Sequence, residues 1–235
     1  MKQTTLRPYG INANKNITFP VGTTVAVKNF YGKVGLDKAV GKHKERGRSL
    51  NSLIQALVSY RLTENLSINK ASDWINRKDV LREFCLSKFE QRTLFRALEI
   101  IGSNKEEILH DIQNSLFSKY DFEHTDINMD WTSFTLWGDK CKKGKYGYSR
   151  DHRPDKKQVT VGLCELREPI NIPIGMTVMP GNTNDQTHFK ETFRQVSPKL
   201  RDGSLVTYDK GANSKDNNEL VLGSKMKYLT SKKLI

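Results

Sequence analysis

The chain has 235 residues, 36% hydrophobic and 28% charged, which is enough to bury a core in one large domain or two modest ones. Lys and Arg outnumber Asp and Glu by 39 to 26, and the net charge of +13 favours nucleic acid as partner over an anionic membrane. Three widely spaced cysteines without a CxxC pair suggest neither a disulfide framework nor a zinc site. The start, MKQTTLRPYG, lacks the apolar core of a signal peptide, and no stretch approaches the roughly 18 apolar residues of a membrane span. We therefore expect a cytoplasmic, nucleoid-associated protein without membrane contact.

The pattern changes after the first 35 residues. Residues 1–35 mix Pro, Gly and Asn with short β-branched runs, which predicts a poorly defined N-terminal segment. Apolar residues at three- and four-residue steps then predict a helical domain over residues 36–120. Gly102 is a candidate helix stop, and Ser103 with Glu106 matches a capping box for the last helix. The predicted helical faces are formed by Leu50, Leu53, Ile54, Leu57, Val58 and Leu62; Ile68, Ala71 and Ile75; Val80, Leu81 and Phe84; Phe89, Leu94, Leu98 and Ile101; and Ile108, Leu109, Ile112, Leu116 and Phe117.

Residues 121–235 contain short β-branched and aromatic runs. Runs at 127–136, 158–166 and 172–178 predict three neighbouring strands, and two further strands are predicted at 205–208 and 226–229. Asn184 or Asp185 can cap a helix before the fourth strand, and Ser214 can cap another after it. The order predicts an α+β or α/β fold, in which a helical N-terminal domain precedes a mixed-sheet domain.

Asp130 and Asp209 each lie near the end of a predicted strand, in NMDWTSF and SLVTYDKG, 79 positions apart. A sheet can bring such acids together at one edge. Two carboxylates about 4 Å apart repel by roughly 4 kcal/mol at an effective dielectric near 20, so a converging pair needs a proton or a cation. Mg²⁺ (or Mn²⁺) suits hard oxygen ligands and would serve phosphodiester chemistry. Either Asp taken alone is more often a turn or helix cap.

Three motifs occur in order: GYSRDHRPDKKQ, PIGMTVMPGNTNDQTHF and VTYDKG. Together they resemble the catalytic domain of DDE-type insertion-sequence transposases over about residues 126–230, and more weakly over 40–120. The resemblance implies a ribonuclease-H-like fold for residues 121–235, metal-dependent cleavage at element ends and transfer of the strand to target DNA. Double-stranded DNA would be the partner, and a homodimer is compatible with it. Asp130 matches the first metal-binding acid in the D-x-T element, and Asp209 the second in D-x-G.

The family's third acid, a Glu in a Y-x-x-R-x-x-x-E-like motif, has no match here. Glu219 is the only acid after Asp216, but it lies on the helix directly following Asp209, and we do not assign it as the missing ligand. We therefore expect an incomplete ribonuclease-H-like domain and a truncated, catalytically impaired transposase. Two alternatives stay open: a non-catalytic DNA-binding remnant or inhibitor of a full-length transposase, and a nuclease completed by another chain.

Basic residues before the first clear helix are candidate phosphate contacts. Residues 1–120 carry 20 basic against 11 acidic residues, a net +9, so this half is the stronger candidate. A solvated charged face explains the run equally well. Short helices over residues 67–84 are compatible with a helix-turn-helix. The run comprises Lys42, His43, Lys44, Arg46 and Arg48, of which Lys42, Lys44, Arg46 and Arg48 are predicted to bind DNA.

Residues in the second half add to this set. His152 and Arg153 either contact phosphate or pack in a Pro-fixed loop against Asp155, and Lys210 keeps the charge, but not the planar geometry, of the Arg often found after the second acid. Turn chemistry and capping explain Gly181, Asn182 and Asp185 better than a place in the active site. We predict that Trp74, Trp131 and Trp137 are core or core-edge residues.

Overall fold

The computed structural model describes residues 21–232 of the chain. It divides into two compact units, Met1–Ile108 and Leu109–Ile235. Helix α7 (Lys105–Lys119) begins in the first unit and ends in the second. No helix among residues 21–232 combines the length and apolarity needed to cross a membrane.

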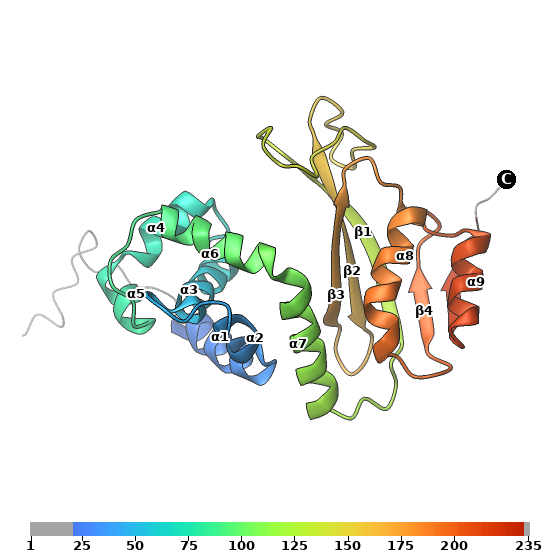
Figure 1. Cartoon of the computed structure of the whole chain (residues 1–235), viewed down its shortest axis with the longest axis horizontal. Helices are drawn as coiled ribbons and strands as arrows, with labels where there is room; N and C mark the ends of the chain where they lie inside the picture. The colour runs from blue at the N-terminus through green and yellow to red at the C-terminus, as the bar shows by residue number, and fades with distance from the viewer. Residues whose placement is uncertain (1–20, 233–235) are drawn as a thin grey trace, which may run out of the picture. The chain divides into compact units, whose positions relative to one another are not determined.

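The described part of the first unit is helical (Figure 1). Leu53, Ala71 and Ile75 are fully buried, and the rings of Tyr60 and Trp74 lie 5.6 Å apart. This core is built by the three- and four-residue apolar spacing of the sequence. The helices before α7 are α1 (Val21–Lys33), α2 (Leu36–Gly41), α3 (Leu50–Thr63), α4 (Ile68–Ile75), α5 (Lys78–Glu83) and α6 (Arg92–Ser103).

Helix α1 occupies part of the segment for which the sequence predicted no defined structure. Its buried side chains form a narrow stripe of Thr24, Val27 and Tyr31, and the Tyr31 hydroxyl donates to Asn51 Oδ1 at 3.0 Å. The β-branched residues around this stripe are poor helix formers, so the local pattern is weak and packing against α3 decides the outcome. Residues 1–20 lie outside the described range.

The predicted capping box at the start of the last helix is wrong. Ser103 is the last residue of α6, Gly102 lies inside that helix, and Asn104 alone separates α6 from α7. The Asn104 side-chain amide donates back to Ile100 O at 2.8 Å, which ends α6 locally.

The second unit has a five-stranded sheet in the order β3-β2-β1-β4-β5. Strands β1, β2 and β3 are antiparallel neighbours, while β4 runs parallel to β1 and β5 parallel to β4. This mixed sheet, preceded by helices, confirms the predicted fold class of a helical domain followed by a mixed-sheet domain. The elements are β1 (Ile127–Thr135), β2 (Gln158–Leu166), β3 (Ile172–Pro180), α8 (Asp185–Val196), the 3-10 turn η1 (Ser197–Lys199), β4 (Leu205–Tyr208), α9 (Lys215–Gly223) and β5 (Lys227–Thr230).

Helix α8 packs on β1, β2 and β3 and forms the centre of the core (Figure 1). Phe189 on α8 lies 5.8 Å from the Trp131 ring and 4.7 Å from the Tyr208 ring, and stacks on Phe193 at 5.7 Å. The helix begins as predicted, because Asn184 Oδ1 accepts the Thr187 amide at 2.8 Å.

Two of the three tryptophans lie where the sequence predicted. Trp74 and Trp131 are buried, but Trp137 is 77% exposed, so its prediction as a core or core-edge residue is wrong. Trp137 follows the end of β1, and the side chains over its ring are cationic: the Arg153 guanidinium at 5.0 Å and Lys156 Nζ at 5.2 Å. Cation–π contacts thus stabilise this ring at the protein surface, where the sequence predicted burial.

Candidate metal centre

The sheet brings Asp130 and Asp209 together. Strands β1 and β4 are parallel and paired through Met129 and Tyr208, so each aspartate is the next residue along its chain. Neighbouring strands lie about 4.8 Å apart, and residues in equivalent register face the same side of a sheet. Both aspartates are exposed, and both line a shallow depression of about 600 Å³. Asp130 and Asp209 therefore lie at neighbouring positions, on β1 and directly after β4.

Backbone amides orient one oxygen of each aspartate. Asp130 Oδ1 accepts the Trp131 amide at 2.7 Å, and Asp209 Oδ1 accepts the amides of Gly211 at 3.0 Å and Ala212 at 3.3 Å. Within residues 21–232, neither Oδ2 atom accepts a hydrogen bond, and no Lys, Arg or His forms an ion pair with either acid. Residues 21–232 therefore leave the charge of this pair uncompensated.

A third carboxylate, Asp185, approaches Asp209 across Gly211. A Cβ atom added at Gly211 would lie 2.6 Å from Asp185 Oδ2 and 3.2 Å from Asp209 Oδ1. Arg150 Nη2 donates to the same Asp185 Oδ2 at 2.7 Å. Burial raises the pKa of Asp185, Arg150 opposes this rise, and the charges of Asp209 and Asp130 add to it. Asp185 therefore belongs to the electrostatic surroundings of the acid pair, beyond the turn and capping role that the sequence favoured.

Neither Arg150 nor Gly211 was predicted to belong to this group. Both occur in the motifs that carry the family resemblance, in GYSRDHRPDKKQ and VTYDKG, so the motifs were the available signal. Within the described part of the chain, no cluster of three or more His, Cys, Asp or Glu side chains is arranged to hold a metal ion. Asp185 therefore does not complete a three-acid centre in this structure.

The other predicted residues of the second unit lie outside the acid pair. Arg153 donates to both carboxylate oxygens of Asp155 at 2.8 Å, and this lowers the pKa of Asp155 to about 2. His152 is exposed, with a left-handed backbone at φ 54°. Lys210 is exposed directly after Asp209. The Arg153 guanidinium is thus engaged within its own loop.

The residues of the basic run in the first unit have different contacts in the folded chain. Lys42 pairs with Glu107 at 2.5 Å, and Lys44 Nζ donates to Arg48 O at 2.9 Å, while Arg46 is exposed. The Arg48 guanidinium donates to Lys88 O at 2.6 Å. That contact places Arg48 in a basic pocket of about 550 Å³, whose other lining residues are Lys88, Phe89, Glu90, Arg92, Thr93 and Arg96.

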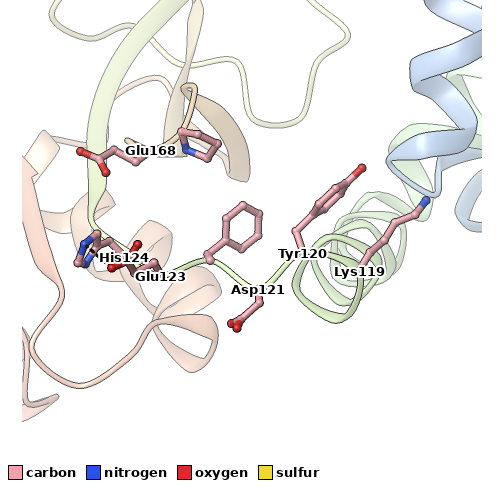
Figure 2. Close-up of a pocket in the computed structure, with 8 residues that line it drawn as sticks. Lys119, Tyr120, Asp121, Glu123, His124 and Glu168 are labelled. Atoms are coloured by element: carbon pink, nitrogen blue, oxygen red, sulfur yellow. Dashed lines mark ion pairs between the residues drawn. The ribbon is translucent and has the colours of Figure 1, made fainter.

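A different pocket, of about 440 Å³, lies at the connection between α7 and β1 (Figure 2). It is lined by residues 119–124 with Glu168 and Pro169. The one ion pair drawn there joins His124 to Glu123 at 3.8 Å, and Asp121 is paired with Arg201 at 2.5 Å. Figure 2 shows the labelled side chains spread around the pocket without converging on one point. This pocket offers no catalytic arrangement.

No protein-family model and no curated protein matches the chain. Among solved structures, it is similar to the piggyBac transposase synaptic complex with hairpin DNA, at 12% identity and a TM-score of 0.46, over 93% of this chain and 52% of that one. It is also similar to a pre-cleavage Mos1 transpososome, at 10% identity and a TM-score of 0.27, over 79% of this chain and 61% of that one. A third similar structure is the Mos1 strand transfer complex, at 14% identity and a TM-score of 0.28, over 79% of this chain and 60% of that one. The chain thus spans between half and two thirds of the length of these structures.

Proposed function

We propose that the chain is a DNA transposase of the DDE type, which cleaves DNA at the ends of an insertion sequence and transfers the strand to target DNA. One observation carries the proposal: Asp130 and Asp209 lie side by side at β1 and β4 of a ribonuclease-H-like sheet, and the described chain supplies neither with a cation. The motifs around both acids resemble those of DDE-type insertion-sequence transposases.

The residues present fit a divalent ion. Mg²⁺ binds through one or two carboxylates and retains places for water and phosphate oxygens, and the Oδ2 atoms of Asp130 and Asp209, which accept no hydrogen bond from residues 21–232, are ligands of this kind. When bound, Mg²⁺ or Mn²⁺ would stabilise charge on the phosphate under attack. The amides of Gly211 and Ala212 fix the Asp209 carboxylate, so this ligand needs little reorganisation.

The charge distribution supports DNA as the substrate. The net charge is +13, and in the first unit Arg48, Lys88, Arg92 and Arg96 surround one pocket. A cluster of this kind binds phosphates and releases their counterions. We assign DNA binding to the helical segment, with Lys42, Lys44, Arg46 and Arg48 as contacts, and further contacts to His152, Arg153 and Lys210.

The experiment measures Mn²⁺ binding and Mg²⁺-dependent strand cleavage by the purified chain. Asp130→Asn and Asp209→Asn should each weaken Mn²⁺ binding and abolish any cleavage, because each removes a charged ligand. Glu219→Gln is the matched control, since Glu219 lies on α9 and pairs with Lys215 at 3.8 Å. Equal Mn²⁺ affinity in the wild type and both Asn variants would refute the proposed centre.

A second candidate is a DNA-binding module without catalysis, such as an inhibitor of a full-length transposase. The observation that favours it is that residues 21–232 hold no three-residue metal cluster of His, Cys, Asp or Glu. Salt-sensitive DNA binding without Mg²⁺-dependent cleavage would favour this module over the enzyme. Cleavage that disappears in both Asn variants would exclude it.

A further inference from the structure

The connection between β1 and β2, residues 136–157, carries a high density of positive charge. We call it the β1–β2 loop. It holds eight basic and three acidic residues, a net +5 of the chain's +13. It extends beyond the end of the strands (Figure 1). A segment so short with so much positive charge is suited to a polyanion.

Besides Trp137, two aromatic side chains of this loop are exposed. Tyr146 is 60% and Tyr148 is 85% exposed, on either side of Gly147. The third ring, Trp137, already carries Arg153 and Lys156 over it. Tyr146 and Tyr148 therefore present large aromatic surfaces to solvent, where a planar ligand can stack on them.

The backbone under these two rings is held firmly. A Cβ atom at Gly147 would lie 2.1 Å from Gly181 O, and one at Gly181 would lie 2.0 Å from Gln158 O. Only glycine permits so close an approach of two backbones. The buried Gln158 amide also donates to Tyr148 O at 2.7 Å and to Gly181 O at 2.9 Å. The rings are thus mounted on a backbone tied to the sheet, so little ordering is needed when they bind.

The same region leads to the acid pair. A groove of about 280 Å³ is lined by Tyr148, Arg150, Asn182, Asp185 and Gly211, among others. Gly211 is also close to Asp209, since a Cβ atom added at Gly211 would lie 3.2 Å from Asp209 Oδ1. The groove that holds Tyr148 and Arg150 thus lies next to Asp209 of the candidate metal centre.

We infer that the β1–β2 loop binds unpaired nucleotides of DNA next to the site of cleavage, with Tyr146 and Tyr148 as stacking platforms and Arg150 as a phosphate contact beside them. The inference rests on the proposed function and adds to it the form of the DNA at this site. Unpaired bases are required because the faces of paired bases are already stacked in a duplex, whereas a free base offers its face to an aromatic ring.

The test measures binding of a labelled single strand and of the blunt duplex of the same sequence, at low salt in EDTA so that no strand is cut. Tyr146→Ala/Tyr148→Ala should weaken single-strand binding by about tenfold or more, because stacking of one base on one ring contributes roughly that factor. Duplex binding should change by less than about twofold. Tyr146→Phe/Tyr148→Phe is the matched control and should retain both affinities, since the rings remain.

A charge control separates stacking from electrostatics. Lys140→Ala/Lys142→Ala removes two exposed cations from the same loop and should weaken both ligands through lost phosphate attraction. The inference is overturned if the Tyr→Ala variant loses equal affinity for single strand and duplex, or loses no affinity. It is also overturned if the Tyr→Phe variant loses as much single-strand affinity as the Tyr→Ala variant. A wild type that binds the duplex but not the single strand overturns it while DNA binding stands. A wild type that binds neither overturns the proposed function as well.

Discussion

Gly211→Ala is the substitution that tests the geometry of the candidate metal centre most directly. The added methyl group would lie 2.6 Å from Asp185 Oδ2, a distance that real Cβ atoms essentially never show, and 3.2 Å from Asp209 Oδ1. Asp185 cannot simply rotate away without losing Arg150, which donates to that same oxygen at 2.7 Å. Either the Arg150–Asp185 pair breaks or the Asp209 carboxylate moves.

Both outcomes have measurable magnitudes. Overpacking of this kind costs about 1–3 kcal/mol in the free energy of unfolding. Displacing groups that orient a metal ligand lowers metal affinity by about 10- to 100-fold. We expect Gly211→Ala to show a lower urea midpoint and weaker Mn²⁺ binding than the wild type, measured by unfolding curves and by calorimetric titration.

Gly223→Ala is the matched control for this substitution. Gly223 is the last residue of α9, and a Cβ atom there meets nothing within 4 Å. Ala at a helical position is neutral or stabilising by up to about 1 kcal/mol relative to Gly. If Gly211→Ala binds Mn²⁺ as tightly as Gly223→Ala and the wild type, the reasoning about Gly211, Asp185 and Asp209 is refuted.

Three further outcomes follow from other parts of the chain. Burial, and to a smaller extent nearby positive charge, lowers the pKa of His188 to about 4 in the folded chain, whereas the unfolded chain takes up this proton near pH 6.5. The free energy of unfolding should therefore fall by about 2–3 kcal/mol between pH 7 and pH 4.5. A urea midpoint that stays constant over that range would contradict this prediction. Thr192→Val should lower the free energy of unfolding by about 1–3 kcal/mol, because Thr192 Oγ1 accepts the buried Trp131 Nε1–H at 3.2 Å. Thr192→Ser keeps that acceptor and is the control. An equal decrease in the urea midpoint of both variants would argue against this hydrogen bond. Arg92→Ala/Arg96→Ala should lower the slope of log Kd against log salt for duplex DNA by about 2, and an unchanged slope would remove the basic pocket from the DNA contacts.

The strands of the second unit were predictable because their signal is local. Short β-branched and aromatic runs predicted strands at 127–136 and 158–166, and the structure has Ile127–Thr135 and Gln158–Leu166. Burial alternates along both strands, so the chain encodes which face packs on α8. The closeness of Asp130 and Asp209 follows from the same local signals, once the parallel pairing of β1 and β4 is formed.

The surroundings of the acid pair were not predictable in this way. Arg150 comes from a loop, Asp185 from the first turn of α8 and Gly211 from the turn after β4, and their contacts depend on how far each segment reaches over the sheet. The basic pocket has the same origin, since Arg48 lies 44 positions before Arg92 and meets its neighbours only through the packing of helices. Helix α1 was missed because its burial is decided by α3, and its own pattern is weak.

Arg150 pairs with Asp185, and this placement explains why Asp130 and Asp209 have no cationic partner among the described residues. A guanidinium 2.7 Å from Asp130 or Asp209 would have compensated their charge and occupied the oxygen atoms that a divalent ion needs, but Arg150 pairs with Asp185 instead. Asp185 is the partly buried member of the group, for which an uncompensated charge would be the most costly. Asp130 and Asp209 are exposed, so solvent screens their repulsion until a cation arrives. The described part of the chain thus pairs the partly buried Asp185 with Arg150 and leaves the exposed carboxylates of Asp130 and Asp209 without a cationic partner, an arrangement that a divalent metal ion would neutralise.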